Sequence, residues 1–263
     1  MARRAVRALA EATRDLPVEL LAFKGVHLAW CVADDPAYRS MADADVLVVS
    51  GSFARVVDRL ERLPEFEVTI RDWSTHCIRY LPANKTIDLH RVALLPAWGG
   101  LRRSALRRRA LPAPALGPGV LVPERVDAAV LALANFVKNG FGLIEPSQAP
   151  TDLALLADKG VTAAALSERL REHKLRRVGL VGMTALARRD RRWEPFVAAL
   201  VRKDGETARA AWFVRAIERA AAVDPYAGLI VVRAIGDAPL STVGSVAWGA
   251  ARGVRDWARR RLR

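Results

Sequence analysis

The chain has 263 residues, of which 52% are apolar and 27% charged. This balance is typical of a globular protein and excludes an intrinsically disordered chain. Lysine and arginine number 42 against 28 aspartate and glutamate residues, so the formal net charge is +14. Such an excess favours contact with nucleic acid, nucleotides or anionic lipid, although the heavy use of arginine throughout the chain explains it equally well.

Several classes of protein are disfavoured by simple features of the chain. The two cysteines, Cys31 and Cys77, are too few for a disulfide framework or a zinc cluster. Arginine and glutamate interrupt the apolar pattern of residues 1–15, which differs from that of a signal peptide. No apolar run approaches the roughly 18 residues needed to span a bilayer. We therefore expect a cytoplasmic protein without a membrane span.

The first hundred residues alternate short apolar runs with amphipathic segments. In chain order, the patterns predict a helix over 1–14, a strand over 19–23, a helix over 26–33, a strand over 43–49 and a helix over 53–63. Three further strands are predicted over 66–70, 76–81 and 86–92. Residues 82–85 are a connection of hairpin length between the last two. This mixture indicates an α+β fold, a short mixed sheet with flanking helices.

The character of the chain changes after residue 100. Five arginines lie within 102–109, followed by three prolines and two glycines within 112–119, which predicts a linker between two domains. Beyond residue 120 the apolar spacing is almost wholly helical. We therefore expect a mixed domain over 1–110 and a helical domain over 120–263. The arginine cluster is either a nucleic-acid contact or a solvated face.

Two aspartates begin the strand predicted over 43–49. Residues i and i+2 of a strand point to the same face, so Asp43 and Asp45 project side by side while Ala44 faces the other way. Two carboxylates at this spacing repel each other, and burying them unpaired is costly. Solvation at the end of a strand removes the conflict, and so does a divalent cation such as Mg2+, which prefers oxygen ligands.

A third carboxylate, Asp88, lies in the strand predicted over 86–92. Its apolar neighbours point away from it, so Asp88 belongs to a polar face with Thr86 and His90. Two strands that offer acids to one face can hold one or two metal ions. His90 either orients Asp88, contacts the substrate, or is a structural histidine at the edge of the sheet.

Lys24 and Gly25 separate the first predicted strand from the helix that follows it. Glycine permits close approach of the backbone, and a helix N-terminus offers free N–H groups to a phosphate. Lys24 adds a positive charge, and Arg39 can pair with a triphosphate. In isolation a Lys-Gly pair is a simple turn. The order of Lys-Gly, Arg, Asp-x-Asp and a later Asp is more specific than any of its parts.

These motifs, "LLAFKGVHLAW", "YRSMADADVLVV" and "TIDLH", resemble the uncharacterised nucleotidyltransferase family of the polymerase-beta-like superfamily. The resemblance covers roughly residues 17–95 and implies the minimal nucleotidyltransferase fold followed by a helical lobe. It implies that Asp43 and Asp45 are metal ligands and that Asp88 is the third catalytic carboxylate. Lys24 and Gly25 stand where the superfamily usually has Gly-Ser or Gly-Gly for phosphate contact.

The resemblance also implies a reaction. A nucleoside monophosphate would pass from an NTP to an acceptor hydroxyl with release of pyrophosphate, using Mg2+ or Mn2+. Lys24, Gly25 and Arg39 would hold the triphosphate. The acceptor stays open among RNA, a protein side chain, a sugar and another small molecule. The alternative is a basic module that binds RNA or a partner, a degenerate transferase without chemistry. The basic C-terminal segment 255–263 is either an interfacial or RNA-binding helix or a frayed terminus.

Overall fold

The computed structural model describes residues 1–38, 40–94, 98, 101–144, 147–224, 227–228, 231–232 and 235. The chain divides into two compact units, one formed by residues 1–93 and 101–128 and the other by 94–100 and 129–263. Among the helices within these residues, none is both long enough and apolar enough to cross a lipid bilayer.

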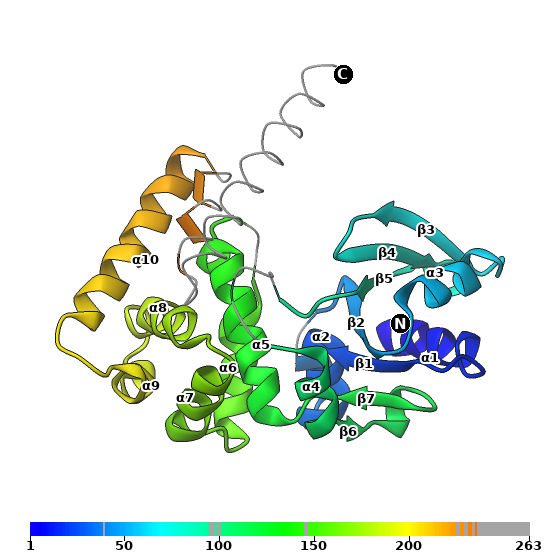
Figure 1. Ribbon diagram of the computed structural model, residues 1–263, viewed down its shortest axis with the longest axis horizontal. Helices are drawn as coiled ribbons and strands as arrows, with labels where there is room; N and C mark the ends of the chain where they lie inside the picture. Colours follow the sequence, from blue (N-terminus) through cyan, green and yellow to red (C-terminus); the bar gives the residue numbers. More distant parts are fainter. Residues whose placement is uncertain are drawn as a thin grey trace. The chain divides into compact units, whose positions relative to one another are not determined.

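The first unit is built around a seven-stranded mixed sheet, labelled in Figure 1. In spatial order its strands are β3 (Phe66–Arg71), β4 (Thr75–Tyr80), β5 (Lys85–His90), β2 (Asp43–Ser50), β1 (Glu19–Phe23), β7 (Val120–Val122) and β6 (Leu111–Pro112). Its helices are α1 (Ala2–Ala12), α2 (Lys24–His27, continued by a π-helical turn over Leu28–Val32), α3 (Phe53–Glu61) and α4 (Arg103–Arg109). The α+β class expected from the sequence is confirmed.

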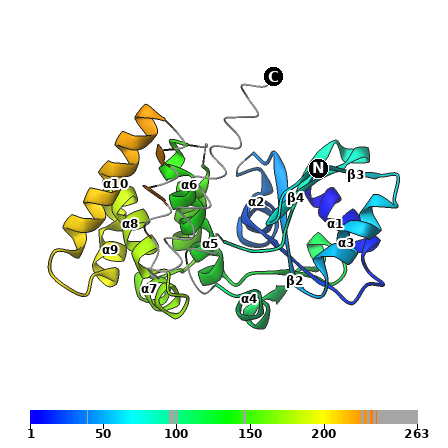
Figure 2. The ribbon, with the colours of Figure 1, turned by 45° about the horizontal axis from the view of Figure 1, so that its top comes forward.

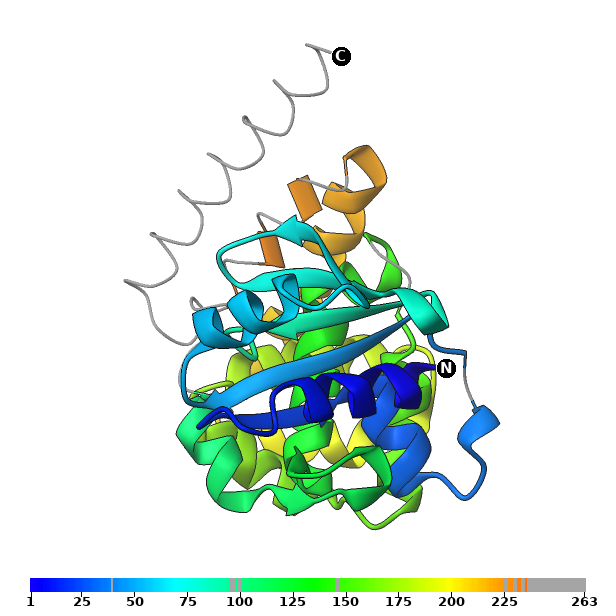
Figure 3. The same ribbon diagram turned by 90° about the vertical axis from the view of Figure 1, so that its right-hand side faces the viewer.

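One face of the sheet carries the hydrophobic core. Ala44, Val46 and Val48 of β2 point to this face, as the alternation along the strand requires. They pack with apolar residues of α1 and α3, which lie over the same side of the sheet (Figure 3). Ser52 begins α3 as its N-cap, where its hydroxyl accepts a hydrogen bond from the backbone of Arg55. On the opposite face, the start of β2 and the length of β5 carry the polar side chains Asp43, Asp45, Thr86, Asp88 and His90, and we call this part the polar face. Leu47 and Val49 continue that face of β2 with buried apolar side chains.

The segment expected to be a linker is part of the first unit instead. Its arginines form α4, and its proline-rich stretch leads into β6 and β7. Strand β7 pairs in parallel with β1, where Leu20 faces Val120, and so extends the sheet. The prediction failed because proline and glycine indicate turns but do not reveal that the short apolar run after them pairs with a distant strand. The compact unit therefore extends beyond residue 110.

The second unit is helical, as expected. Its helices are the greater part of α5 (Arg125–Lys138), then α6 (Ala149–Asp158), α7 (Ala163–Glu172), α8 (Arg176–Ala187), α9 (Glu194–Leu200) and α10 (Glu206–Val223). Helix α8 packs against both α9 and α10 (Figure 2). An open hollow of about 940 Å³ is lined by residues between Thr184 and Thr207. None of the predicted site residues belongs to its lining. The basic C-terminal segment lies outside the described residues.

Candidate active site

The pairing of four strands brings the candidate residues into one row. Asp45 on β2 is the direct partner of Asp88 on the parallel strand β5. Asp88 is in turn opposite Cys77 on β4, and Asp45 is opposite Phe23 at the end of β1. Directly opposed residues of neighbouring strands point to the same face, so these side chains share the polar face of the sheet. Two carboxylates thus lie side by side at the centre of this face.

Asp45 is buried and receives two hydrogen bonds on one oxygen. Lys24 Nζ lies 2.5 Å from Asp45 Oδ1, and His90 Nε2 lies 3.0 Å from the same atom. Burial by itself would raise the pKa of the Asp45 carboxyl. The charge of Lys24 and the hydrogen bond from His90 outweigh burial and hold this pKa well below its usual range. Asp45 therefore keeps its negative charge inside the fold.

Lys24 shows the complementary effect. Burial acts to lower the pKa of its ammonium group, but the attraction of Asp45, followed by that of Asp43 and Asp88, raises the pKa above its usual value. The ammonium also lies 5.3 Å from the centre of the Phe23 ring. Lys24 is therefore held as a cation among three carboxylates.

His90 is oriented from both ends of its ring. Its Nδ1 lies 3.1 Å from the hydroxyl oxygen of Thr75, while its Nε2 contacts Asp45. An ionised carboxylate can only accept, so Nε2 donates to Asp45, whereas the direction of the hydrogen bond between Nδ1 and the Thr75 hydroxyl depends on the tautomer of the ring. The ring of Phe23 packs edge-on against His90, with 5.1 Å between ring centres. The imidazole is thus fixed by two hydrogen bonds and one aromatic contact.

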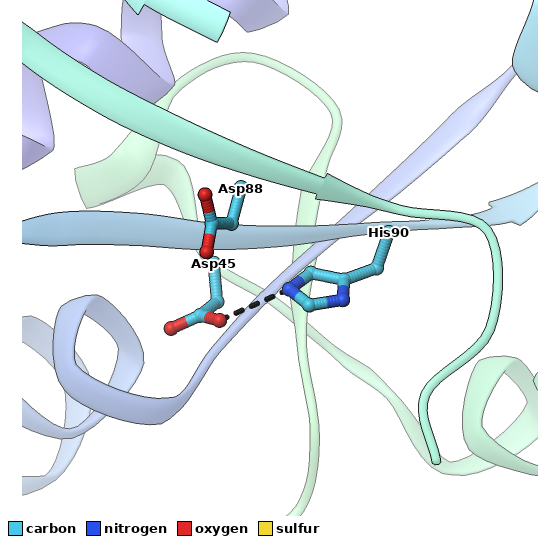
Figure 4. A group of neighbouring side chains, drawn as sticks. All are labelled: Asp45, Asp88 and His90. Carbon is cyan, nitrogen blue, oxygen red and sulfur yellow. Dashed lines mark hydrogen bonds and ion pairs between the residues drawn. The ribbon is translucent and has the colours of Figure 1, made fainter. Parts of the chain in front are cut away.

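Asp45, Asp88 and His90 form a group that can hold a metal ion. One potential ligand atom from each lies within 4.8 Å of the others. Figure 4 shows the three side chains converging from β2 and β5, with the contact between Asp45 and His90 dashed. Carboxylate oxygens are the ligands of Mg2+ and Mn2+, and imidazole nitrogen is accepted by transition metals. The two carboxylates therefore fit a divalent cation, and His90 would join them through Nε2 only after giving up its hydrogen bond to Asp45.

Asp43 lies next to this group without being one of its three members. Its direct partner on β5 is Thr86, so it is one step along the same face from Asp45. Burial raises the pKa of the Asp43 carboxyl, and repulsion by Asp45 and Asp88 raises it further. A carboxylate with a raised pKa among other carboxylates gains from a nearby cation. The two aspartates of "DAD" thus differ, since Asp45 has a cationic partner at hydrogen-bond distance.

The turn between β1 and α2 has a feature that the sequence did not predict. Lys24 adopts a left-handed backbone conformation with φ of +53°, which is uncommon for a residue other than glycine. Gly25, which was expected to permit close approach of the backbone to a phosphate, does not have a positive φ and lies within α2. Strain of this kind persists where the surroundings impose it and is enriched at functional sites. The strained residue is the one whose ammonium contacts Asp45.

Most of the predicted site residues lie together in the structure, but His90 has a different partner from the one considered and Arg39 is not described. His90 hydrogen-bonds Asp45, whereas the alternatives drawn from the sequence were orientation of Asp88, contact with the substrate and a structural role. Arg39 lies outside the described residues. The roles assigned to Asp43, Asp45, Asp88, Lys24 and Gly25 remain predictions, although the structure places the first four within mutual electrostatic reach.

Two further residues of the polar face were missed by sequence reasoning. Thr75 contacts His90, and Cys77 is opposite Asp88. Burial, followed by the negative charge of Asp88, raises the pKa of the Cys77 thiol to about 12, so the thiol stays protonated. His76 lies between them in sequence but points to the core face, where its ring packs edge-on against Phe53. The alternation of side chains along β4 places Thr75 and Cys77 on one face of that strand. It identifies that face as the polar one only once the register of β4 with β5 is known.

Most arginines of the α4 cluster form hydrogen bonds or ion pairs within the first unit. Arg103 donates to the backbone carbonyl of Val48, Arg107 pairs with Glu19, and Arg109 makes a bidentate pair with the fully buried Asp127. Arg102 and Arg108 are exposed. Three of the five arginines thus stabilise the fold, which weakens the case for a nucleic-acid surface on this helix.

Comparison with known proteins identifies a family. No curated protein and no solved structure gives a significant match. The model of the family described as "Uncharacterised nucleotidyltransferase" matches residues 1–189, which include the whole first unit and the second unit as far as the end of α8. A match over this share of the chain, together with the paired carboxylates on the polar face, establishes the assignment. The chain belongs to this nucleotidyltransferase family.

Proposed function

We propose that the protein is a metal-dependent nucleotidyltransferase that moves a nucleoside monophosphate from an NTP to an acceptor hydroxyl. The observation that carries the proposal is the direct pairing of Asp45 with Asp88 on the polar face, in a chain of a nucleotidyltransferase family. The acceptor oxygen forms a bond to the α-phosphorus, the bond from that phosphorus to the bridging oxygen breaks, and pyrophosphate leaves. The hydroxyl proton is released to a base.

Asp45 and Asp88 would hold a divalent cation, with Asp43 as the third carboxylate. All three offer oxygen atoms, which favours Mg2+ or Mn2+. When bound, such an ion neutralises charge on the phosphates and lowers the pKa of a coordinated hydroxyl. This set extends the described group of Asp45, Asp88 and His90 by one residue.

Other residues would bind and orient the reactants. Lys24 and Arg39 would bind the triphosphate through their charges, with the backbone near Gly25 close to the phosphates. Asp88 is the candidate to accept the proton of the acceptor hydroxyl, because it has no cationic partner comparable with that of Asp45 among the described ion pairs. His90 would keep Asp45 in a fixed orientation through its hydrogen bond.

The experiment that tests the proposal combines nucleotide binding with turnover. Calorimetry with each of the four NTPs is run with and without Mg2+, and pyrophosphate release is measured with RNA, protein and sugar fractions as acceptors. We expect binding that needs Mg2+ and a loss of turnover of about 100-fold or more in Asp88→Asn and in Asp43→Asn with Asp45→Asn. Asp58→Asn is the matched control, because Asp58 is exposed on α3.

The same measurements separate the enzyme from a basic binding module. Salt-sensitive RNA binding without Mg2+-dependent affinity for any NTP would favour the module and contradict the transferase. Unchanged turnover in the double aspartate variant would also contradict the transferase. The module has support from the net charge of +14, while the engagement of three arginines of α4 within the fold counts against it.

A further inference from the structure

The ammonium of Lys24 and a divalent cation would compete for the same carboxylate. Lys24 Nζ is 2.5 Å from Asp45 Oδ1, an atom that also accepts the hydrogen bond from His90. The side chain of Lys24 is 23% exposed and that of Asp45 is 7% exposed, so water screens this ion pair poorly. A dication bound to either oxygen of Asp45 therefore lies close to a fixed positive charge.

The backbone of Lys24 indicates that this contact is maintained against strain. A residue other than glycine at φ of +53° is held there at a cost in free energy. Phe23, the residue before it, is opposite Asp45 in the pairing of β1 with β2, so the strained turn begins directly beside that carboxylate. Asparagine and glycine tolerate this conformation better than lysine. Compared with asparagine or glycine, lysine supplies an ammonium group at this position despite the less favourable backbone conformation.

We propose that Lys24 is an internal counter-cation that competes with the catalytic metal ion at Asp45 and moves away when a triphosphate binds. The proposal rests on the proposed function, because it takes the same carboxylates as metal ligands. It assigns Lys24 a regulatory role in addition to phosphate binding. Metal and nucleotide then bind cooperatively, and neither occupies the site fully without the other.

Elementary electrostatics gives the direction of the effect. An ammonium repels a dication with an energy that grows as the dielectric constant of the surroundings falls. The oxygens of a triphosphate offer other acceptors for the three N–H groups of Lys24, so a bound triphosphate draws the ammonium away from Asp45. Because linkage is reciprocal, the gain in metal affinity caused by the triphosphate equals the gain in triphosphate affinity caused by the metal.

The test measures Mn2+ binding in the absence of nucleotide, using the loss of the free-ion signal in electron paramagnetic resonance. The full-length chain is compared with Lys24→Met, which removes the charge but keeps the length of the side chain, and with Lys24→Asn, which also suits the left-handed backbone. We expect both variants to bind Mn2+ about tenfold more tightly than the unaltered chain, a difference of about 1.4 kcal/mol. Asp45→Asn should remove the tight binding.

The chain contains a matched control for the lysine. Lys174 has φ of +55° and is exposed at the end of α7, in the helical unit. Lys174→Met and Lys174→Asn remove the same charge from the same type of backbone conformation. Both should leave the Mn2+ affinity unchanged, so that neither net charge nor relief of backbone strain explains a change at Lys24.

A second readout is thermal stability with and without Mn2+. Loss of Lys24 leaves the buried carboxylate of Asp45 without its cationic partner, so the melting temperature of Lys24→Met should fall and then recover when Mn2+ binds. The rise caused by Mn2+ should exceed that of the unaltered chain. A Lys24→Met or Lys24→Asn chain that stays unfolded in saturating Mn2+ would overturn the proposal, because the metal could not then replace the ammonium.

The remaining outcomes distinguish the two proposals. Equal or weaker Mn2+ binding in Lys24→Met than in the unaltered chain overturns competition and leaves the nucleotidyltransferase proposal standing. No Mn2+ binding by any form of the chain in the absence of nucleotide also overturns competition, whereas the nucleotidyltransferase proposal is tested separately by turnover in the double aspartate variant. Tighter binding confined to the Lys24 variants supports the inference.

Discussion

The same strands of the central sheet bury apolar side chains on one face and charged or polar side chains on the other. On the core face, Val46 of β2 and Leu89 of β5 are fully buried among apolar residues of α1 and α3. On the other face of the same strands, Asp45 is only 6% exposed, beside Asp88 and His90. Asp45 is thus nearly as buried as the valine next to it in sequence, although it carries a charge.

The difference lies in the partners that each face provides. The core face offers no compensating charge, so its residues must be apolar. The polar face surrounds Asp45 with Lys24 and His90, and the resulting ion pair and hydrogen bond offset the loss of hydration. Burial is therefore compatible with a charged side chain only where an opposite charge is fixed nearby. Four substitutions or changes of pH, given in order of decreasing expected effect, test this difference between the two faces.

A carboxylate placed on the core face, one residue after Asp45, should unfold the first unit. Val46→Asp places a charge on the core face without a partner, and we expect a loss of about 4 kcal/mol or more in the free energy of unfolding. Denaturant unfolding followed by circular dichroism measures this loss. Asp45→Asn is the control on the other face and should leave a cooperatively folded chain. A Val46→Asp chain of nearly normal stability would mean that the core face tolerates charge.

Acid should destabilise the fold through His27, which is buried and 2% exposed on α2. Burial, together with the charge of Arg125, lowers the pKa of His27 from 6.5 to about 4. Its folded pKa lies below the unfolded value, so the stability it contributes is present above pH 6.5 and is lost as the pH falls towards 4. The full loss amounts to about 3 kcal/mol.

Denaturant unfolding between pH 7 and 4 measures this effect. His27→Leu cannot be protonated, so its stability should vary less over the same range. An equal decline in both chains would show that His27 is not the group responsible. His27 is thus a buried titratable group that remains neutral, whereas the buried Asp45 remains charged.

Replacing His90 should lower activity, whereas replacing His76 on the neighbouring strand should not. His90 belongs to the polar face, and His76 packs against Phe53 on the core face. We expect His90→Leu to lower Mn2+ affinity or nucleotide transfer by about 10-fold to 100-fold, because it removes a hydrogen bond that orients Asp45. His76→Leu should leave both unchanged, since Nδ1 of His76 is buried without a hydrogen-bond partner. Similar losses of activity in the two variants would contradict the separation of the faces.

The smallest effect is expected at Thr75. Thr75→Val keeps the shape of the side chain but removes the hydroxyl that contacts His90 Nδ1. Loss of one such hydrogen bond corresponds to about 1 kcal/mol, so we expect less than a tenfold fall in transfer activity. Thr75→Ser retains the hydroxyl and should restore the rate. Failure of serine to do so would assign the effect of Thr75→Val to packing.

Much of the site was predictable because strand alternation is a local property. The apolar residues around Asp88 and the run after Asp45 place the acids on one face of each strand, and the structure agrees. The helix after β1, the N-cap of α3 and the hairpin between β4 and β5 also follow from neighbouring residues. These features depend on side-chain period, capping and turn length, which a single sequence displays.

The tertiary structure decided which strands meet and at what register. Only the parallel pairing of β2 with β5 makes Asp45 the partner of Asp88, and a shift of one residue would have placed Ile87 there instead. The pairing of β7 with β1 turned an expected linker into part of the sheet. The left-handed turn at Lys24 brought an ammonium to Asp45. Sequence alone determined which residues are acidic, basic and apolar, whereas long-range pairing, which no local pattern encodes, determined which of them touch.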